Sequence, residues 1–395
     1  MKTIEQQKYT SSTCLVDGSS LKSFYANAFR AMGVPEAHAR TAAEGIFYAD
    51  LHGFDTHGAV NFERIYLKMI REGSVNPLAT PTIISERMAV ALVDSKNALG
   101  FVTGSFAMNE AISRARAFGI GAVAVRNSSH CGSMGFYAKQ AIDADLIGLA
   151  FTNLGTQGIL RPPHGTRALL GTNVLAAGAP AKQNAAYNLD MSTAVTSAGR
   201  IRLAQKKGES IPPGWLLDDM GETVTDPSFF ERGIGHLQFA GGHKGYGLAI
   251  LVDILCGLLT GASVGPNLAN LQGDGSNGRN DKNIGHFFLA LNIADFRSVD
   301  LFTAAMDEML SILQACPTTL ADKQVMYPGL PEAEEAIRRG KSGIPLALPL
   351  MTVLEEVARQ FDIKPPNLVL CQPKIAESGQ AGGAGEALEA GGVKK

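Results

Sequence analysis

The sequence predicts an α/β protein whose middle part forms a sheet covered by helices. Three short apolar runs, at residues 88–93, 121–125 and 147–151, have the length and composition of buried strands. Helical patterns separate them at residues 101–117 and 136–144. Strands and helices that alternate along a chain in this way are typical of an α/β domain.

The two ends of the chain are mainly helical. Residues 21–50 carry two helical patterns that break near Pro35, and residues 62–72 continue in the same style. Helical patterns return at residues 300–315 and 350–360. We therefore expect the C-terminal part to pack back on the N-terminal helices.

These patterns divide the chain into domains. We expect a mainly helical domain built from residues 15–85 and 299–370, and an α/β domain over residues 86–298. The chain before about residue 15 is polar and is expected to be loose. Residues 377–395 are rich in Gly, Ala and Glu and are expected to form a flexible tail.

One segment of the α/β domain predicts a buried helix face. Residues 247–259 place apolar side chains at helical spacing, and we expect this face to be buried. Its members are Leu248, Leu251, Val252, Leu255, Leu258 and Leu259. A polar, Gly-rich stretch over residues 262–285 is expected to be a surface loop that leads to a strand at 287–293.

Composition excludes several classes of function. The 395 residues include 35 Lys and Arg against 37 Asp and Glu, which argues against a nucleic-acid groove and a polybasic membrane surface. The expected partner is a small molecule or a second copy of the chain. The five cysteines are far apart, so neither a disulfide framework nor a metal site is indicated, and a reducing compartment is expected.

The sequence also contains no targeting or membrane signal. The N-terminus lacks the apolar core of a signal peptide. The longest apolar run, residues 247–262, is too short to span a bilayer. We therefore expect a cytoplasmic protein.

The most informative motif lies where an apolar strand gives way to a helix. Residues 127–137 place His130, with Gly132 and Gly135, at this junction. A helix N-terminus offers free backbone N–H groups to an anionic ligand, and α/β enzymes bind ligands at such junctions. The alternative is a tight polar turn with a surface histidine.

A second histidine motif, Asp55-Thr56-His57-Gly58, lies between polar turns. His52 and His57 are five residues apart, which is unsuited to a helical zinc pair. A hydroxyl beside a histidine suits general acid/base chemistry. A buried or capping histidine is the alternative.

Four further segments give weaker signals. Residues 241–247 place a histidine and a lysine before the apolar helix, where they could bind an anion or form a flexible turn. Residues 171–173 and 189–193 are small polar clusters. In the second, Asp190 could orient a histidine, hold a ribose hydroxyl or cap the helix that follows. Residues 273–278 match GxGxxG, but they follow no strand and open no apolar helix, so they are not a dinucleotide fingerprint.

Taken in order, these segments resemble the malate/L-lactate dehydrogenase family of NAD(P)-dependent oxidoreductases, which lack the Rossmann fold. The resemblance covers roughly residues 21–360. It rests on residues 49–58, 127–137, 171–173, 189–193 and 242–262. It implies a non-Rossmann NAD(P)-binding sheet domain, NAD or NADP as the cofactor, a small carboxylate as substrate and a homodimer.

The resemblance also implies roles for individual residues. His57 with Thr56, and His130, are similar to the family's histidines at the substrate, and either histidine could be the acid/base. The residues expected to contact the cofactor are His130, Cys131, Gly132, Ser133, Met134, Asp190, Met191, Ser192, His243 and Lys244. Thr172 is expected to contact the substrate.

One departure from the family bears on the substrate. The family commonly has an arginine four residues after the first histidine, where this chain has Asn61. That arginine is expected to bind the substrate carboxylate. Arg64, one helical turn further on, is the candidate to replace it.

The sequence therefore predicts a dehydrogenase that transfers a hydride between NAD(P) and a small 2-hydroxy or 2-oxo acid. One alternative is a reductase of a cyclic imine carboxylate, and another is a nucleotide-binding relative without catalytic activity, motivated by Asn61. A thiol hydrolase that uses Cys131 beside His130 is a third alternative, although neighbours in sequence rarely point at each other.

Overall fold

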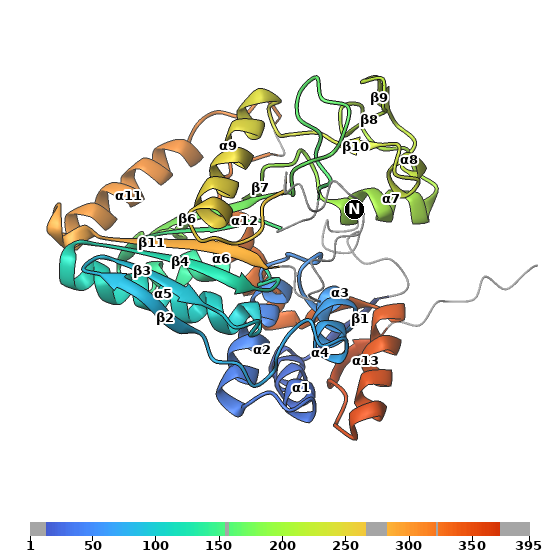
Figure 1. The fold of residues 1–395 in the computed structure, drawn as a ribbon, viewed down its shortest axis with the longest axis horizontal. Coiled ribbons are helices and arrows are strands. Elements are labelled where there is room, and N and C mark those ends of the chain that lie inside the picture. Colours follow the sequence, from blue (N-terminus) through green and yellow to red (C-terminus); the bar gives the residue numbers. More distant parts are fainter. Residues whose placement is uncertain (1–12, 155–157, 266–282, 321–322, 372–395) are drawn as a thin grey trace, which may run out of the picture.

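A seven-stranded mixed sheet lies at the centre of the computed structural model, which describes residues 13–154, 158–265, 283–320 and 323–371 (Figure 1). The strand order is β2-β3-β4-β11-β5-β6-β7, and among the described pairs only β3 and β4 run parallel. The strands are β2 (Thr82–Arg87), β3 (Val90–Asp94), β4 (Ile120–Ser128), β5 (Leu146–Thr152), β6 (Val174–Ala179), β7 (Tyr187–Ser192) and β11 (Ile284–Asn292). The predicted α/β class is confirmed.

The strand predicted at residues 88–93 begins two residues later than expected. Met88 has a φ of 49° and lies in the turn between β2 and β3. Strand β2 was not predicted, because its side chains are largely exposed and include charges, as suits the edge of a sheet.

Helices α5 (Gly100–Phe118) and α6 (Gly135–Ile142) cover one face of the central sheet. A Cβ added to Gly148 of β5 would lie only 2.5 Å from the Cβ of Ala141, so α6 packs directly on the strand. The apolar core between helices and sheet includes Tyr137 and Phe288, which are fully buried. This packing fixes the end of β4, where His130 follows.

The N- and C-terminal segments pack together beneath α5 and α6 (Figure 1). Their helices are α1 (Gly18–Ala31), α2 (Glu36–Leu51), α3 (Ala59–Asn61), the π-helix η2 (Phe62–Leu67), α4 (Lys68–Arg71), α12 (Leu330–Ser342) and α13 (Leu348–Phe361). A small antiparallel sheet of order β12-β1-β13 joins the two ends, with β1 (Thr13–Val16), β12 (Ile344–Ala347) and β13 (Leu368–Cys371). The predicted break near Pro35 is confirmed, and α12 and α13 pack on the N-terminal helices as predicted. The helix at the predicted residues 300–315 does not, because α11 lies on the other side of the central sheet (Figure 1).

Strand β1 corrects two predictions. The chain before residue 15 is not loose where it is described, because Cys14 is buried in the helical core and its strand pairs on both sides. Cys14 is also disulfide-bonded, so the prediction that no disulfide is indicated is wrong. Spacing along the chain does not reveal a disulfide here, because β1 pairs with β13 although these are the first and last described strands.

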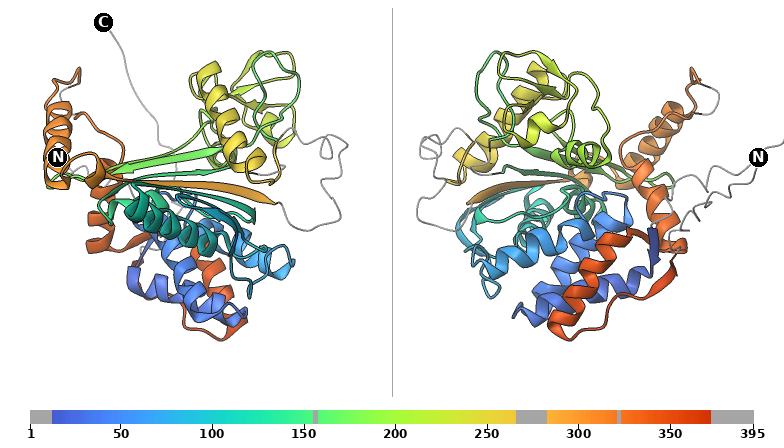
Figure 2. Two further views of the ribbon diagram at one scale, coloured as in Figure 1. Left: turned by 60° about the vertical axis from the view of Figure 1, so that its left-hand side comes forward. Right: turned by 90° about the vertical axis from the view of Figure 1, so that its right-hand side faces the viewer.

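The remaining elements lie beside β7 and on the second face of the central sheet. They are α7 (Ala198–Lys207), β8 (Leu216–Leu217), β9 (Thr223–Val224), α8 (Ser228–Glu231), β10 (His236–Leu237), α9 (His243–Asp253), the π-helix η3 (Ile254–Leu258), the 3-10 helix η4 (Ile293–Asp295) and α11 (Val299–Gln314). Figure 2 shows α9 and α11 on the side of the sheet opposite α5 and α6. None of the described helices is long and apolar enough to cross a membrane.

The apolar face predicted to be buried on α9 is largely exposed. Leu251 and Leu258 are 43% and 67% exposed, and Leu248 and Leu259 are exposed as well, whereas Val252 is buried as predicted. Ala249 of α9 packs in an apolar cluster with Leu160 and Phe239, and η3 packs closely on β11, where a Cβ on Gly285 would lie 1.6 Å from the Cys256 carbonyl oxygen. Small residues permit close packing, so the leucines point outward.

Two predicted features fall outside the described residues. These are the GxGxxG match at residues 273–278 and the tail at residues 377–395. Most of the loop predicted over residues 262–285 also lies outside them.

Candidate active site

His57 lies in the short connection between α2 and α3. Its backbone N–H donates to the carbonyl oxygen of Phe54 at 2.8 Å, which tightens the turn. The side-chain Nδ1 lies 2.9 Å from the hydroxyl oxygen of Thr56. Burial lowers the pKa of His57 below its ordinary value, so the ring is neutral at pH 7 and can accept a proton.

His130 follows β4, in the loop that leads to α6. The backbone N–H of Gly132 donates to its Nδ1 at 3.3 Å, and the hydroxyl of Tyr66 lies 3.1 Å from the same nitrogen. A nitrogen that accepts from a backbone N–H carries a lone pair, so in the neutral ring the proton is on Nε2. His130 therefore presents an N–H donor from Nε2.

The fold brings the two histidines together. Their ring centroids are 6.1 Å apart and the ring planes differ by 20°. Since His57 is neutral and His130 carries a proton on Nε2, one site holds a base and a hydrogen-bond donor within reach of one small molecule. This pair forms the centre of the candidate active site.

Asn61 and Arg64 extend the site from the His57 side. The Asn61 side-chain amide donates to the carbonyl oxygen of Thr56 at 2.8 Å, and its Oδ1 accepts from Arg64 Nη2 at 2.5 Å. Asn61 is buried while Arg64 is exposed. The asparagine therefore links an exposed guanidinium to the segment that carries His57.

Tyr66 is a functional candidate that sequence reasoning missed. It lies with Arg64 in the π-helix η2, and its side chain is fully buried between Phe101 and the His130 ring. A buried tyrosine at helical spacing has the same pattern as an ordinary core residue. The wider turn of a π-helix cannot be predicted from spacing, although such bulges are frequent at functional sites.

Cys131 and Met134 face the core and not His57 or His130; the histidine that the Cys131 thiol does approach, at 3.9 Å, is the buried His286. The Cys131 thiol contacts Met134 Sδ at 3.5 Å, and both side chains are buried against α6 and the sheet. Burial raises the pKa of Cys131 to about 12, so the thiol is protonated at pH 7. The thiol hydrolase alternative is therefore unsupported, since the nucleophile would have to be a thiolate.

Asp190 lies on β7 and approaches the His130 loop from the other side. Its Oδ2 accepts the backbone N–H of Gly135 at 2.8 Å, at the start of α6. Burial raises the pKa of Asp190 to about 6. One of the roles predicted for Asp190 was to cap the helix that follows it. Asp190 instead caps α6, which precedes it in the chain.

The other candidate residues lie near the end of β7. The carbonyl oxygen of Thr172 accepts both the N–H and the hydroxyl of Thr193, which follows Ser192. The start of α9 packs on the same residue, because a Cβ on Gly245 would lie 3.0 Å from the Thr193 carbonyl oxygen. The exposed side chains of His243 and Lys244 open this helix. A line of candidates thus runs from the His130 loop along β7 to α9.

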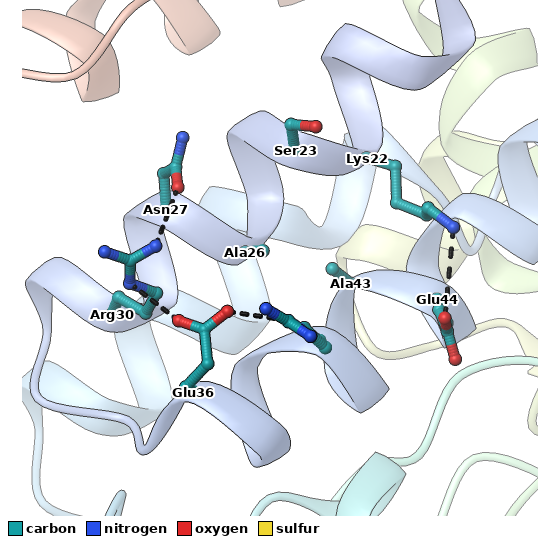
Figure 3. Close-up of a pocket in the computed structure, with 9 residues that line it drawn as sticks. Lys22, Ser23, Ala26, Asn27, Arg30, Glu36, Ala43 and Glu44 are labelled. Carbon is teal, nitrogen blue, oxygen red and sulfur yellow. Dashed lines mark hydrogen bonds and ion pairs between the residues drawn. The ribbon is translucent and has the colours of Figure 1, made fainter.

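A groove on the outer surface of α1 and α2 is separate from this site (Figure 3). It is lined by charged side chains that pair with one another, including Arg30 and Arg40 with Glu36 at 3.0 and 2.6 Å. Since these cations already have partners, the groove offers no free charge to a ligand. Among the described residues, no cluster of His, Cys, Asp or Glu is arranged to hold a metal ion.

Comparison with known proteins establishes the family. A family model described as malate/L-lactate dehydrogenase matches residues 16–355. This chain belongs to the malate/L-lactate dehydrogenase family. The resemblance predicted from the ordered motifs is confirmed, and the chain is accordingly a dehydrogenase.

Individual relatives agree with this family assignment. The malate dehydrogenase of Pyrococcus abyssi is 35% identical over 350 residues, which cover 87% of this chain and 94% of the relative. The L-sulfolactate dehydrogenase of Methanothermobacter thermautotrophicus is 34% identical over 334 residues, covering 84% and 93%. The crystal structure of malate dehydrogenase from Entamoeba histolytica superposes with a TM-score of 0.85 at 28% identity, covering 90% of this chain and all of that one.

Proposed function

We propose that this dehydrogenase transfers a hydride between NAD(P) and a small 2-hydroxy or 2-oxo acid at the His57–His130 pair. The observation that carries the proposal is the 6.1 Å approach of half-buried His57, whose pKa is lowered, to His130, whose Nδ1 accepts the Gly132 N–H. The substrates named for relatives, malate and sulfolactate, are acids of this class. A cyclic imine carboxylate is the second candidate substrate.

The two histidines divide the proton chemistry. In the oxidation direction His57 accepts the hydroxyl proton of the substrate at Nε2. The lone pair is on Nε2 when the Nδ1–H donates its hydrogen bond to the Thr56 hydroxyl oxygen. His130 donates a hydrogen bond from Nε2 to the same substrate oxygen and stabilises the charge that develops on it. In the reduction direction the protonated His57 returns the proton. When bound, the nicotinamide accepts or supplies the hydride.

The loop between His130 and α6 fits a bound cofactor. The Ser133 hydroxyl is buried and has no hydrogen-bond partner among the described residues, which suits a site completed by a polar ligand. Lys244 at the start of α9 supplies a cation for a phosphate. We assign NAD or NADP contacts to the backbone of residues 130–134, to Asp190, Met191 and Ser192 on β7, and to His243 and Lys244.

The carboxylate of the substrate is assigned to Arg64. Asn61 holds this guanidinium beside the His57 segment, so the arginine that the family places at position 61 is replaced from one turn further along the helix. A guanidinium can bind a carboxylate through two parallel hydrogen bonds. Thr172, near the end of β7, is a second substrate candidate.

Titration with NADH and NADPH, followed by a panel of 2-oxo acids and cyclic imines, tests this function. We expect saturable quenching or enhancement of nicotinamide fluorescence and oxidation of the bound cofactor by one substrate class. The variant Arg64→Met should raise KM for that substrate about 10- to 100-fold with unchanged cofactor binding, because a charge-assisted hydrogen bond is lost. Arg71→Met, at a nearby arginine that pairs with Glu63, is the control. No binding of either nucleotide would contradict the function.

We also propose that the active form is a homodimer that uses the second face of the sheet. Alternate residues of β5 and β11 on this face are apolar and half-exposed, with Leu149 opposite Leu289 and Phe151 opposite Phe287. The exposed leucines of α9 and the exposed apolar residues of α11 lie on the same side. An apolar surface of this extent is unusual for a monomer and suits a second copy of the chain.

Size-exclusion chromatography with light scattering tests the dimer. Leu258→Glu should convert the protein to monomers, because it places a charge on the apolar face of η3. Leu78→Glu is the matched control, since Leu78 is 68% exposed, similar to Leu258 at 67%, and lies in a loop away from this face. A monomeric wild type would refute the proposal.

A further inference from the structure

Two buried ionisable residues hold the segment that carries His57, and neither takes part in the proposed chemistry. Burial raises the pKa of one of them, Asp50, to about 7. Asp50 lies near the end of α2 and is 2% exposed. Arg339 lies on α12, almost 300 positions further along the chain, and is 5% exposed. Charged side chains are rarely buried this deeply unless their hydrogen bonds are satisfied.

Asp50 fixes the end of the His57 segment from the inside. Its Oδ1 accepts the backbone N–H of Ala59 at 2.8 Å, and its Oδ2 accepts the hydroxyl of Tyr25 at 2.8 Å. The backbone passes so close that a Cβ on Gly58 would lie 1.8 Å from Asp50 Oδ1. The carboxylate therefore determines where the chain runs immediately after His57.

Arg339 fixes the start and the middle of the same segment from the outside. Its Nη1 donates to the backbone carbonyl oxygen of Asp50 at 2.6 Å and to Asp55 Oδ1 at 2.7 Å. Its Nε donates to Glu335 Oε1 at 2.6 Å, one helical turn earlier on α12. Glu335 also pairs with Arg338, and the two arginines lower the pKa of Glu335 to about 2. The Glu335 carboxylate that binds Arg339 is therefore charged at pH 7.

We propose that Asp50 and Arg339 are positioning residues that jointly set the place of the His57 ring. Asp50 and Arg339 together hold the segment at Asp50, Asp55 and Ala59. His57 is two residues from Asp55 and two residues from Ala59. A displacement of about 1 Å at a reacting group can lower the rate about 100-fold, so restraint at this level affects catalysis without contact with substrate. The inference rests on the proposed role of His57.

The test compares Arg339→Met and Asp50→Asn with the wild type by hydrogen exchange and by kinetics. We expect amides at residues 52–59 to exchange at least about tenfold faster, and kcat to fall about 10- to 100-fold while KM for the cofactor is unchanged. Arg339→Lys should recover only part of kcat, since one ammonium nitrogen cannot reach Asp50 and Asp55, as Nη1 does, while a second nitrogen binds Glu335, as Nε does. Arg40→Met removes a matched Arg–Glu pair on α2, remote from the site, and should alter neither readout.

Exchange at residues 52–59 that stays at the wild-type rate in both variants would overturn the inference, as would faster exchange with unchanged kcat. Asp50→Asn keeps the size of the side chain, so it decides the question if Arg339→Met does not fold. If the wild-type protein transfers no hydride, the proposed function fails, and the exchange comparison still decides whether these residues hold the segment.

Discussion

Replacement of His57 or His130 by alanine is expected to lower kcat about 100- to 10,000-fold, which is the usual contribution of a positioned acid or base. The nucleotide should still bind, because most of the assigned cofactor contacts lie on the backbone of residues 130–134, on β7 and on α9. Stopped-flow measurement of NADH formation and NADH fluorescence titration separate these effects. His38→Ala, on α2 and away from the site, is the matched control.

The pH dependence of the rate tests the role of His57 as the base. Burial lowers the pKa of His57 from 6.5, and a base is active in its neutral form above its pKa. Oxidation by the wild type should therefore be on its plateau at pH 7 and should fall only below the usual histidine range. His57→Ala should abolish that acidic limb. Wild-type turnover in both alanine variants would eliminate the proposed chemistry.

Gly58→Ala is expected to destabilise the fold by at least about 2 kcal/mol and to abolish activity. A methyl group would lie 1.8 Å from Asp50 Oδ1. Either the buried carboxylate or the His57 segment must move. Urea denaturation and kcat measure the two consequences.

Gly340→Ala provides the control for this substitution. Gly340 lies in α12, and a Cβ there would meet no atom within 4 Å. Alanine in a helix interior is favoured over glycine by about 1 kcal/mol, so this variant should be as stable as the wild type or more stable. Equal stability of Gly58→Ala and Gly340→Ala would show that the segment adapts to the added methyl without loss.

The α/β class and the two histidine motifs could be predicted from the sequence, because both depend on local patterns. Apolar runs of strand length and helical spacing are readable within a few turns of chain, so β4, β5 and α5 were predicted close to their observed bounds. The motifs around His57 and His130 also led to the family, which the comparison confirmed. Sequence order alone did not show that these histidines face each other.

Contacts between residues far apart in the chain could be found only in the folded structure. Arg339 reaches Asp50 and Asp55 across almost 300 positions, and Asp190 caps a helix that precedes it. The exposed leucine face of α9 was predicted to be buried, since a helical pattern shows which residues share a face but not which face meets the core. Such contacts depend on how distant elements pack, and the periodicity of one segment carries no information about its neighbours in space.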